Sequence, residues 1–245
     1  MNRYKIVIEY KGTNFVGWQK QDNGISIQES IEKSIKELTQ ETVQVFGAGR
    51  TDAGVHALGQ VAHFDLVKNF SKDSIRDGLN KYLRHYLISI VEASKVKDNF
   101  HSRFSAKKRE YLYKIINRRA PLTVDKNLAW VFHKKLDIKK MQDAAVFFIG
   151  QHNLNAFRSI NCQSKTTIRT IDKIQIINKK DIISIIVQAK SFLHSQVRIM
   201  VGTLVYVGEG KIDPNEILKI IKIGKRENAG PTAPAEGLYL TNVIY

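Results

Sequence analysis

The first ten residues of the chain alternate between apolar and polar side chains. The apolar members of this alternation are Tyr4, Ile6, Ile8 and Tyr10. A period of two places them on one face, which predicts a half-buried β-strand. After a break at Asn23-Gly24, Ser26 and Glu29 form the pattern of a capping box at a helix N-terminus. The chain therefore begins with a strand followed by an amphipathic helix.

The same kind of pattern continues through the first hundred residues. Helical spacing of apolar residues predicts helices over 27–38 and 75–86, and shorter apolar runs predict strands over 43–46, 60–66 and 87–91. The first half therefore has the order β-α-β-β-α-β.

The second half of the chain repeats this order of elements. Strands are predicted at 110–117, 168–177, 182–189 and 238–244, and helices at 138–148, 197–205 and 213–223. The last of these helices begins at Asp213-Pro214 and ends at Gly224. Residues 178–181 join two of the strands as a hairpin.

These patterns predict an α+β protein. Two β-α-β-β-α-β runs indicate two split-βαβ (ferredoxin-like) halves with mostly antiparallel sheets that meet at a central cleft. We expect the boundary within 104–108, which gives an N-terminal α+β domain at 1–105 and a C-terminal α+β domain at 106–245.

The charge of the chain indicates its kind of partner. Its 245 residues include 39 Lys and Arg against 23 Asp and Glu, for a net charge of +16. Folded proteins this basic most often bind nucleic acid. A single cysteine, Cys162, excludes an intrachain disulfide. Since we find neither a signal peptide nor a run near the roughly 18 apolar residues that cross a bilayer, we expect a cytoplasmic protein with no membrane partner.

The segment from Gly47 to His56, GAGRTDAGVH, concentrates glycine and polar residues. Asp52 lies between Arg50 and His56, and neighbouring positive charge favours the carboxylate form of its side chain. The segment has neither the glycine spacing of a dinucleotide site nor the Gly-Lys-Ser/Thr of a P-loop. Two interpretations remain at this point: a catalytic carboxylate, or a surface turn in which Asp52 hydrogen-bonds its own backbone.

A metal site is a third interpretation of the same region. Asp52, His56, His63 and Asp65 are all of a type that binds metal ions. Their spacing matches no familiar metal motif, however, and a lone histidine on a strand is more often simply hydrogen-bonded. We therefore predict that the protein binds no metal.

Basic and aromatic residues are interleaved between positions 103 and 119. This stretch has seven basic residues against one acid, Glu110, with Phe104, Tyr111 and Tyr113 among them. Cations beside aromatic rings are typical of an RNA surface. The cations expected to contact RNA are Arg103, Lys107, Lys108 and Arg109. The alternative is a solvated strand edge with a half-buried tyrosine face, which applies at least to Tyr113.

Arg198 follows the apolar Val197 at the start of a predicted helix. An arginine that is partly buried among apolar neighbours needs a carboxylate partner. The alternative is an exposed helix residue.

Five blocks of the chain resemble the bacterial tRNA pseudouridine synthase A type, the tRNA pseudouridine(38–40) synthase family. They cover residues 10–19 (YKGTNFVGWQ), 49–57 (GRTDAGVHA), 100–106 together with 109–113, 192–198 (FLHSQVR) and 233–239 (APAEGLY). Their order and spacing extend over nearly the whole chain, which makes the resemblance specific. Two segments depart from the family's pattern, because 151–157 lacks an acidic residue after its histidine and 83–85 lacks a proline.

The resemblance implies an isomerase that converts uridine to pseudouridine at positions 38, 39 and 40 in the anticodon stem-loop of tRNA. It also implies that no cofactor or metal takes part, and that a homodimer holds the tRNA at the central RNA-binding cleft. Asp52 matches the catalytic aspartate of the family, and Arg50 matches the arginine that helps to displace the target base. Tyr111 matches the tyrosine that lies against the uracil, and Arg198 matches the basic partner of the aspartate.

Elementary chemistry is consistent with this interpretation. The reaction breaks the N1–C1′ bond, turns the uracil and joins C5 to C1′, so a single carboxylate suffices, whereas sugar hydrolases need two. Water must be excluded, which requires a uridine flipped into a tight pocket. Two other classes remain, a non-catalytic RNA-binding protein and a metal-dependent phosphodiesterase.

Overall fold

The computed structural model describes all residues from Met1 to Tyr245, and the chain divides into two compact units. Unit 1 comprises Met1–Lys107 and Tyr239–Tyr245, and unit 2 comprises Lys108–Leu238. The expected C-terminal domain at 106–245 included the last strand, whereas the structure groups Tyr239–Tyr245 with the first unit.

The sheet of unit 1 is built around β1 (Asn2–Tyr10), which pairs antiparallel with both β3 (His56–Leu66) and β4 (Ile88–Val96). The other edge of β3 has two short partners. β2 (Phe46–Gly47) pairs antiparallel near its C-terminal end, and β10 (Leu238–Ile244) pairs parallel at its N-terminal end. The order β4-β1-β3-β2 is the order of a split-βαβ unit, as predicted.

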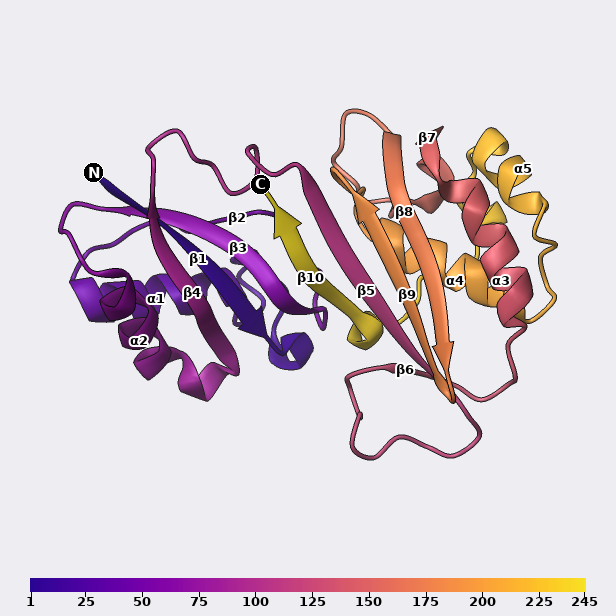
Figure 1. Ribbon diagram of the computed structural model, residues 1–245, viewed down its shortest axis with the longest axis horizontal. Coiled ribbons are helices and arrows are strands. Elements are labelled where there is room, and N and C mark those ends of the chain that lie inside the picture. The colour runs from indigo at the N-terminus through magenta and orange to yellow at the C-terminus, as the bar shows by residue number, and fades with distance from the viewer. The chain divides into compact units, whose positions relative to one another are not determined.

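The alternation predicted for the first strand is observed. Tyr4, Ile6, Ile8 and Tyr10 are all buried. The helices of unit 1 are α1 (Ile27–Thr39) and α2 (Lys72–Leu83), which contact each other, and α2 contacts β4 (Figure 1).

Only half of the predicted capping box forms at the start of α1. The Ser26 side chain accepts a hydrogen bond from the Glu29 backbone N–H at 3.2 Å, as predicted. The Glu29 carboxylate, however, pairs with Lys33 at 3.0 Å along the helix. The N-cap therefore depends on the serine.

Unit 2 contains the antiparallel strands β5 (Lys108–Asn117), β9 (Ile182–Ala189) and β8 (Ile168–Lys179), in that order across the sheet (Figure 1). Two further strands extend this sheet: β7 (Gly150–Asn153) pairs with β8, and β6 (Trp130–Phe132) pairs with β5.

The elements predicted for the second half therefore lacked two strands, β6 and β7. β6 has only three residues, and β7 reads Gly-Gln-His-Asn, so neither carries the apolar alternation that marks a strand.

The helices of unit 2 are α3 (Ile138–Ala145), α4 (Gln196–Gly208) and α5 (Glu216–Ile223). α5 begins after Asn215 rather than at Pro214, because Asp213 accepts the Asn215 backbone N–H at 2.9 Å and forms a turn first. Single turns of 3-10 helix occur at Gly12–Asn14, Arg84–Tyr86, Val146–Phe148, Asn155–Phe157, Arg226–Asn228 and Ala235–Gly237. The α+β class with mostly antiparallel pairing is confirmed. The longest helices have 13 residues, and none is both long and apolar enough to cross a membrane.

Candidate functional site

The loop that carries Asp52 connects β2 to β3 and is tied to β3 near its start. The Ala48 N–H donates to the Val61 carbonyl at 2.7 Å, and the buried Gln60 side chain donates to the Gly49 carbonyl at 2.8 Å. At the other end of the loop, the Val55 N–H donates to the Asp52 carbonyl at 3.2 Å. These contacts define the path of the loop. Asp52 is half-buried within it, and Arg50 is exposed.

Thr51, the neighbour of Asp52, is held by a segment forty residues earlier. Its hydroxyl lies 2.8 Å from the Tyr10 hydroxyl, and its carbonyl accepts the Trp18 N–H at 3.0 Å. Thr51 is only 7% exposed. Both its side chain and its backbone are therefore fixed, which restricts the orientation of the adjacent carboxylate.

Two glycines allow this segment to approach the Asp52 loop. A Cβ atom at Gly12 would lie 2.0 Å from the Val55 carbonyl oxygen. One at Gly17 would lie 2.7 Å from the Thr51 carbonyl oxygen, and Gly17 also has a φ of +115°, where side chains are strained. Residues 10–19, the first of the blocks that resemble the family, therefore support the Asp52 loop.

His56 has a structural role at the end of the same loop. It is 1% exposed, its Nδ1 accepts the Gly12 backbone N–H at 3.0 Å, and its ring stacks on Tyr239 with centroids 4.8 Å apart. Tyr239 belongs to the last resembling block, so this stacking joins β10 to the start of β3.

The four candidate metal ligands have other partners. Asp65 forms a bidentate ion pair with Arg3, with both N–O distances below 3 Å. The Nδ1 atom of His63 lies 2.9 Å from the Ser102 hydroxyl. The structure contains no group of three or more His, Cys, Asp or Glu side chains placed to hold a metal ion.

The pKa of the buried His63 side chain is well below its ordinary value. Burial, and then the nearby His101 and Arg3, lower its pKa from 6.5 to about 4. In the unfolded chain the same ring takes up a proton near pH 6.5. The unfolded state therefore binds more protons between these two values, and acid favours unfolding there.

We expect the free energy of unfolding to fall as the pH drops from about 6.5 to about 4. At about 1.36 kcal/mol per pKa unit, His63 accounts for at most about 3.4 kcal/mol of this fall. Urea unfolding of wild type and His63→Gln at pH 7 and pH 4.5 checks it, with the exposed His85→Gln as control. The free energy of unfolding should differ less between pH 7 and pH 4.5 in His63→Gln than in wild type or His85→Gln. An equal difference in all three proteins would contradict the assignment to His63.

The β5 strand places one basic residue and two aromatic residues on its buried face. Arg109, Tyr111 and Tyr113 share the buried face, at 7%, 8% and 0% exposed. The Tyr113 hydroxyl donates to the Pro234 carbonyl at 2.7 Å, and burial raises its pKa. Tyr113 thus has a structural role, although it is fully buried rather than half-buried at a solvated edge. Tyr111 instead meets the ring of Phe192 edge-on, with centroids 5.2 Å apart.

The four predicted RNA-contacting cations differ in exposure. Arg103, Lys107 and Lys108 are exposed, and Lys108 lies 3.6 Å from Asp172. Arg109 is buried, and its guanidinium donates to the Lys190 carbonyl. This hydrogen bond joins Arg109 to the backbone just beyond the end of the neighbouring strand β9.

Arg198 lies in the first turn of α4 and is half-buried, so it is not a fully exposed helix residue. Its Nε donates to the Ala233 carbonyl at 2.7 Å, and its own carbonyl accepts the Ala233 N–H at 3.1 Å. A Cβ atom at Gly202, one turn further along, would lie 1.8 Å from the Pro231 carbonyl oxygen. The resembling blocks 192–198 and 233–239 are thus in direct contact.

The sequence patterns single out Asp52 and Arg198, but not the residues that hold each of them in place. Thr51, Gly12, Gly17 and Trp18 fix the Asp52 loop, and Ala233 fixes Arg198. One sequence feature indicates the role of Gly12, Gly17 and Trp18. They belong to a segment rich in glycine and aromatic residues directly after a strand, and an ordinary surface turn would not need a tryptophan.

Comparisons with known proteins show the family to which the chain belongs. The sequence model of the family described as tRNA pseudouridine synthase matches residues 6–105 and 144–245. A protein of Parvibaculum lavamentivorans named tRNA pseudouridine synthase A is 49% identical over 245 residues, covering 100% of both chains. Proteins with the same name are 51% identical in Anaplasma phagocytophilum, covering 99% of this chain and 100% of the relative, and 50% identical in Ehrlichia ruminantium, covering 99% of each.

The matched segments include the Asp52 loop, the 10–19 segment that supports it, and the α4 and 233–239 segments around Arg198. The chain therefore belongs to the tRNA pseudouridine synthase family. It is of the A type, an isomerase of uridine in tRNA.

Proposed function

We propose that this protein isomerises uridine at positions 38, 39 and 40 in the anticodon stem-loop of tRNA, with Asp52 as its one catalytic carboxylate. The observation that carries this proposal is the fixation of the Asp52 loop. Thr51 is bonded through both its side chain and its backbone, and Gly12 and Gly17 leave no space between the two segments. A catalytic group must be held in its productive geometry, whereas a solvent turn requires no such support.

The reaction needs one carboxylate and no second reactant. The N1–C1′ bond breaks, C5 bonds to C1′, the proton leaves C5, and N1 gains a proton, so the atoms balance within the nucleotide. Asp52 serves as the nucleophile or the base in this sequence. Hydrolysis would leave an abasic site, so the uridine must be flipped out of the helix into a site without water.

Three other residues have roles in the proposal through the family resemblance. Arg50 is exposed two residues before Asp52, which suits a side chain that displaces the target base. Tyr111, nearly buried against Phe192, offers a ring for the uracil. The resemblance assigns to Arg198, which is fixed by Ala233, the role of the basic partner of the catalytic aspartate.

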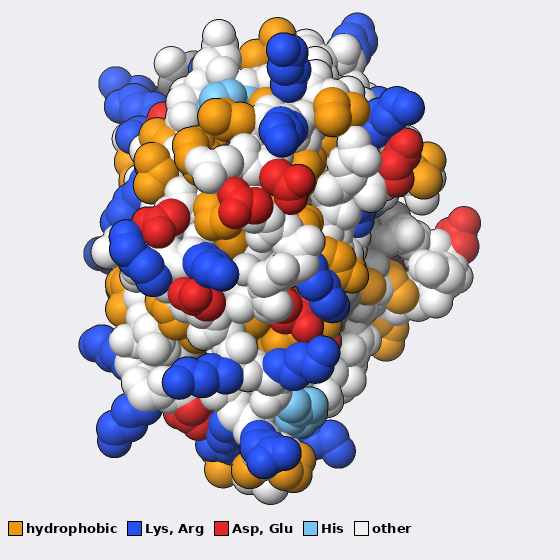
Figure 2. Space-filling model, turned by 90° about the vertical axis from the view of Figure 1, so that its right-hand side faces the viewer, with side chains coloured by type: hydrophobic (Ala, Val, Ile, Leu, Met, Phe, Trp, Pro, Cys, Tyr) orange, Lys and Arg blue, Asp and Glu red, His pale blue; other side chains and the backbone are white.

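We further propose that the protein acts in the cytoplasm as a homodimer, and that Arg103, Lys107 and Lys108 contact tRNA phosphates. Arg109 supports this strand from its buried face. The face of the molecule in Figure 2 mixes Lys and Arg with Asp and Glu and shows no continuous basic patch. The net charge of +16 is therefore not concentrated on that face.

Detection of pseudouridine in tRNA, with and without EDTA, tests the proposal. We expect new pseudouridine at positions 38 to 40, at the same rate with chelator, and at the same rate for Cys162→Ser. Binding of tRNA without pseudouridine would indicate a non-catalytic RNA-binding protein. Cleaved tRNA, lost with EDTA and restored by added metal, would indicate a phosphodiesterase.

A further inference from the structure

An exposed aromatic ring stands on the turn at residues 101–105, beyond the end of β4. Phe104 is 75% exposed, although phenylalanine is usually buried. Its ring centroid lies 4.4 Å from that of His101, and the Arg103 guanidinium lies over it at 5.6 Å. A ring with a cation beside it is suited to a partner with both a flat surface and negative charge.

The turn that presents this ring is fixed from inside. Ser102 is completely buried, and its N–H donates to His63 Nδ1 at 3.2 Å. Its hydroxyl donates to the Phe46 carbonyl at 2.5 Å, and its carbonyl accepts the Tyr245 hydroxyl at 2.7 Å. Phe104 is therefore held outward by a rigid turn, and its exposure is a property of the fold.

Two more rings continue from Phe104 into the protein. His101 lies 5.8 Å from Phe46, which is 39% exposed and stacks on the buried His63 at 5.1 Å. We call Phe104, His101 and Phe46 the aromatic ridge. Burial, Arg3 and Arg103 lower the pKa of His101, so its ring is neutral at neutral pH.

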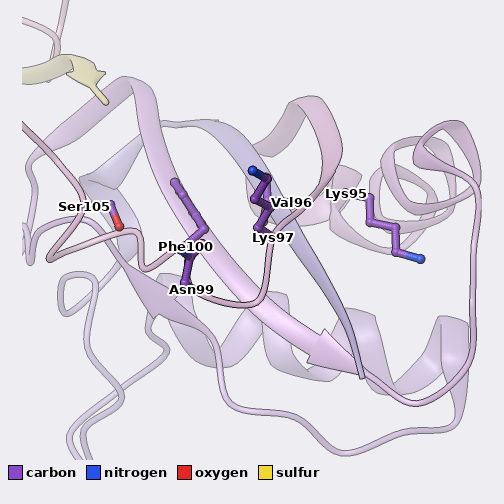
Figure 3. A pocket seen from close by; sticks show the side chains of 6 residues that line it. All are labelled: Lys95, Val96, Lys97, Asn99, Phe100 and Ser105. Carbon is purple, nitrogen blue, oxygen red and sulfur yellow. The ribbon is translucent and has the colours of Figure 1, made fainter.

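A hollow of about 770 Å³ lies beside the ridge, lined by Lys95, Val96, Lys97, Asn99, Phe100 and Ser105. Figure 3 shows the Phe100 ring between Ser105 on one side and Lys97 on the other. Both lysines are exposed, and a serine hydroxyl and an asparagine amide add hydrogen-bond donors. Such a lining suits phosphate groups.

The charges of this region favour RNA over a protein partner. Residues 95–105 carry three exposed cations, Lys95, Lys97 and Arg103, against one acid, Asp98. Aromatic rings that stack on bases, next to a basic groove for the backbone, are the usual parts of a site for single-stranded nucleic acid.

We propose that the aromatic ridge and this hollow form one RNA subsite, separate from the Asp52 loop, in which an unpaired base of the tRNA stacks on Phe104 while adjoining phosphates lie along Lys95 and Lys97. The inference rests on the proposed function only for the identity of the RNA as tRNA. The subsite acts in binding, so its loss should raise the KM for tRNA and leave kcat unchanged.

Substitution of Phe104 tests the stacking. We expect Phe104→Leu to raise the KM for tRNA and the Kd from filter binding about tenfold, with kcat at saturating tRNA within twofold of wild type. Phe104→Tyr keeps a ring and should stay within twofold in both constants. Ile160→Ala is the control, because Ile160 is also an exposed apolar residue, at 92%, and this variant should change neither KM nor Kd. Because Phe104 is exposed, all three variants should unfold at the wild-type temperature.

Substitution of the two lysines tests the phosphate contacts. Each phosphate contact on a single strand contributes about 0.7 to the slope of log Kd against log salt concentration. Lys95→Gln/Lys97→Gln should therefore lower that slope by about 1.4. The control Lys139→Gln/Lys140→Gln removes two exposed lysines of α3 and should leave the slope unchanged.

Three outcomes would overturn the subsite. The first is a KM for Phe104→Leu equal to that of wild type, and the second is a loss of tRNA affinity in Phe104→Tyr as large as that in Phe104→Leu. The third is a change in the oligomeric state of Phe104→Leu on sedimentation, which would make the ridge a contact between copies of the chain. Filter binding does not depend on turnover. A wild-type protein that binds tRNA through Phe104 but forms no pseudouridine at positions 38 to 40 would therefore refute the proposed function and leave the subsite standing.

Discussion

Asp52→Asn should retain the fold and the affinity for tRNA while losing at least about a thousandfold in turnover. The amide has nearly the shape of the carboxylate, so the loop held by Thr51 keeps its path. Only the carboxylate can act as a nucleophile or a base. Turnover should be measured by the appearance of pseudouridine under single-turnover conditions, and affinity by filter binding.

A matched control for this variant is Asp143→Asn. Asp143 is an exposed carboxylate on α3 whose ion pair is with Lys139 of the same helix. It should keep wild-type turnover within a factor of two. Asp52→Asn turnover within tenfold of wild type would remove Asp52 from the mechanism.

Gly12→Ala should reduce turnover at least tenfold, even where the protein remains fully folded. The added Cβ would lie 2.0 Å from the Val55 oxygen and 2.7 Å from the Val55 carbonyl carbon, so backbone must move. The movement shifts the loop between Val55 and Asp52, and displacements of about 1 Å can reduce a rate by about a hundredfold. Overpacking should also lower the free energy of unfolding by about 1–3 kcal/mol.

Gly78→Ala separates the two effects of that substitution. Its added Cβ would also be too close to a neighbour, at 2.6 Å, but the neighbour is the end of the Leu38 side chain. The contact between Gly78 and Leu38 lies between α2 and α1, away from the Asp52 loop, so Gly78→Ala should leave turnover unchanged. Urea unfolding and single-turnover rates at 25 °C check both variants. An equal loss of turnover in both would mean that Gly12 acts only through stability.

The parts of the fold that could be predicted from the sequence are those marked by a local pattern of residues. The alternation in β1 and the caps at Ser26 and Gly224 are determined by neighbouring residues, and the structure confirms them. β6 and β7 are too short to show a period. The parallel pairing of β10 with β3 joins Tyr239 to His56, and no local pattern indicates such a distant partner.

The candidate site shows the same division. Asp52 and Arg50 stood out because polar and glycine residues are concentrated around them. The contacts of Thr51 with Tyr10 and Trp18 could not be predicted, since hydrogen bonds across forty residues leave no pattern in composition. Arg109 was interpreted as a surface cation from its charge alone, but its position in the strand places it on the buried face of β5.

The place of β10 in unit 1 affects how the protein is made. During translation the residues of unit 2, Lys108–Leu238, leave the ribosome between the main part of unit 1 and its last segment. At 5 to 20 residues per second this interval is on the order of 10 s. Throughout it the nascent chain has no Tyr239 to stack on His56 and no Tyr245 to bind Ser102. The nascent chain therefore lacks one support of the Asp52 loop until β10 is available to pair with β3.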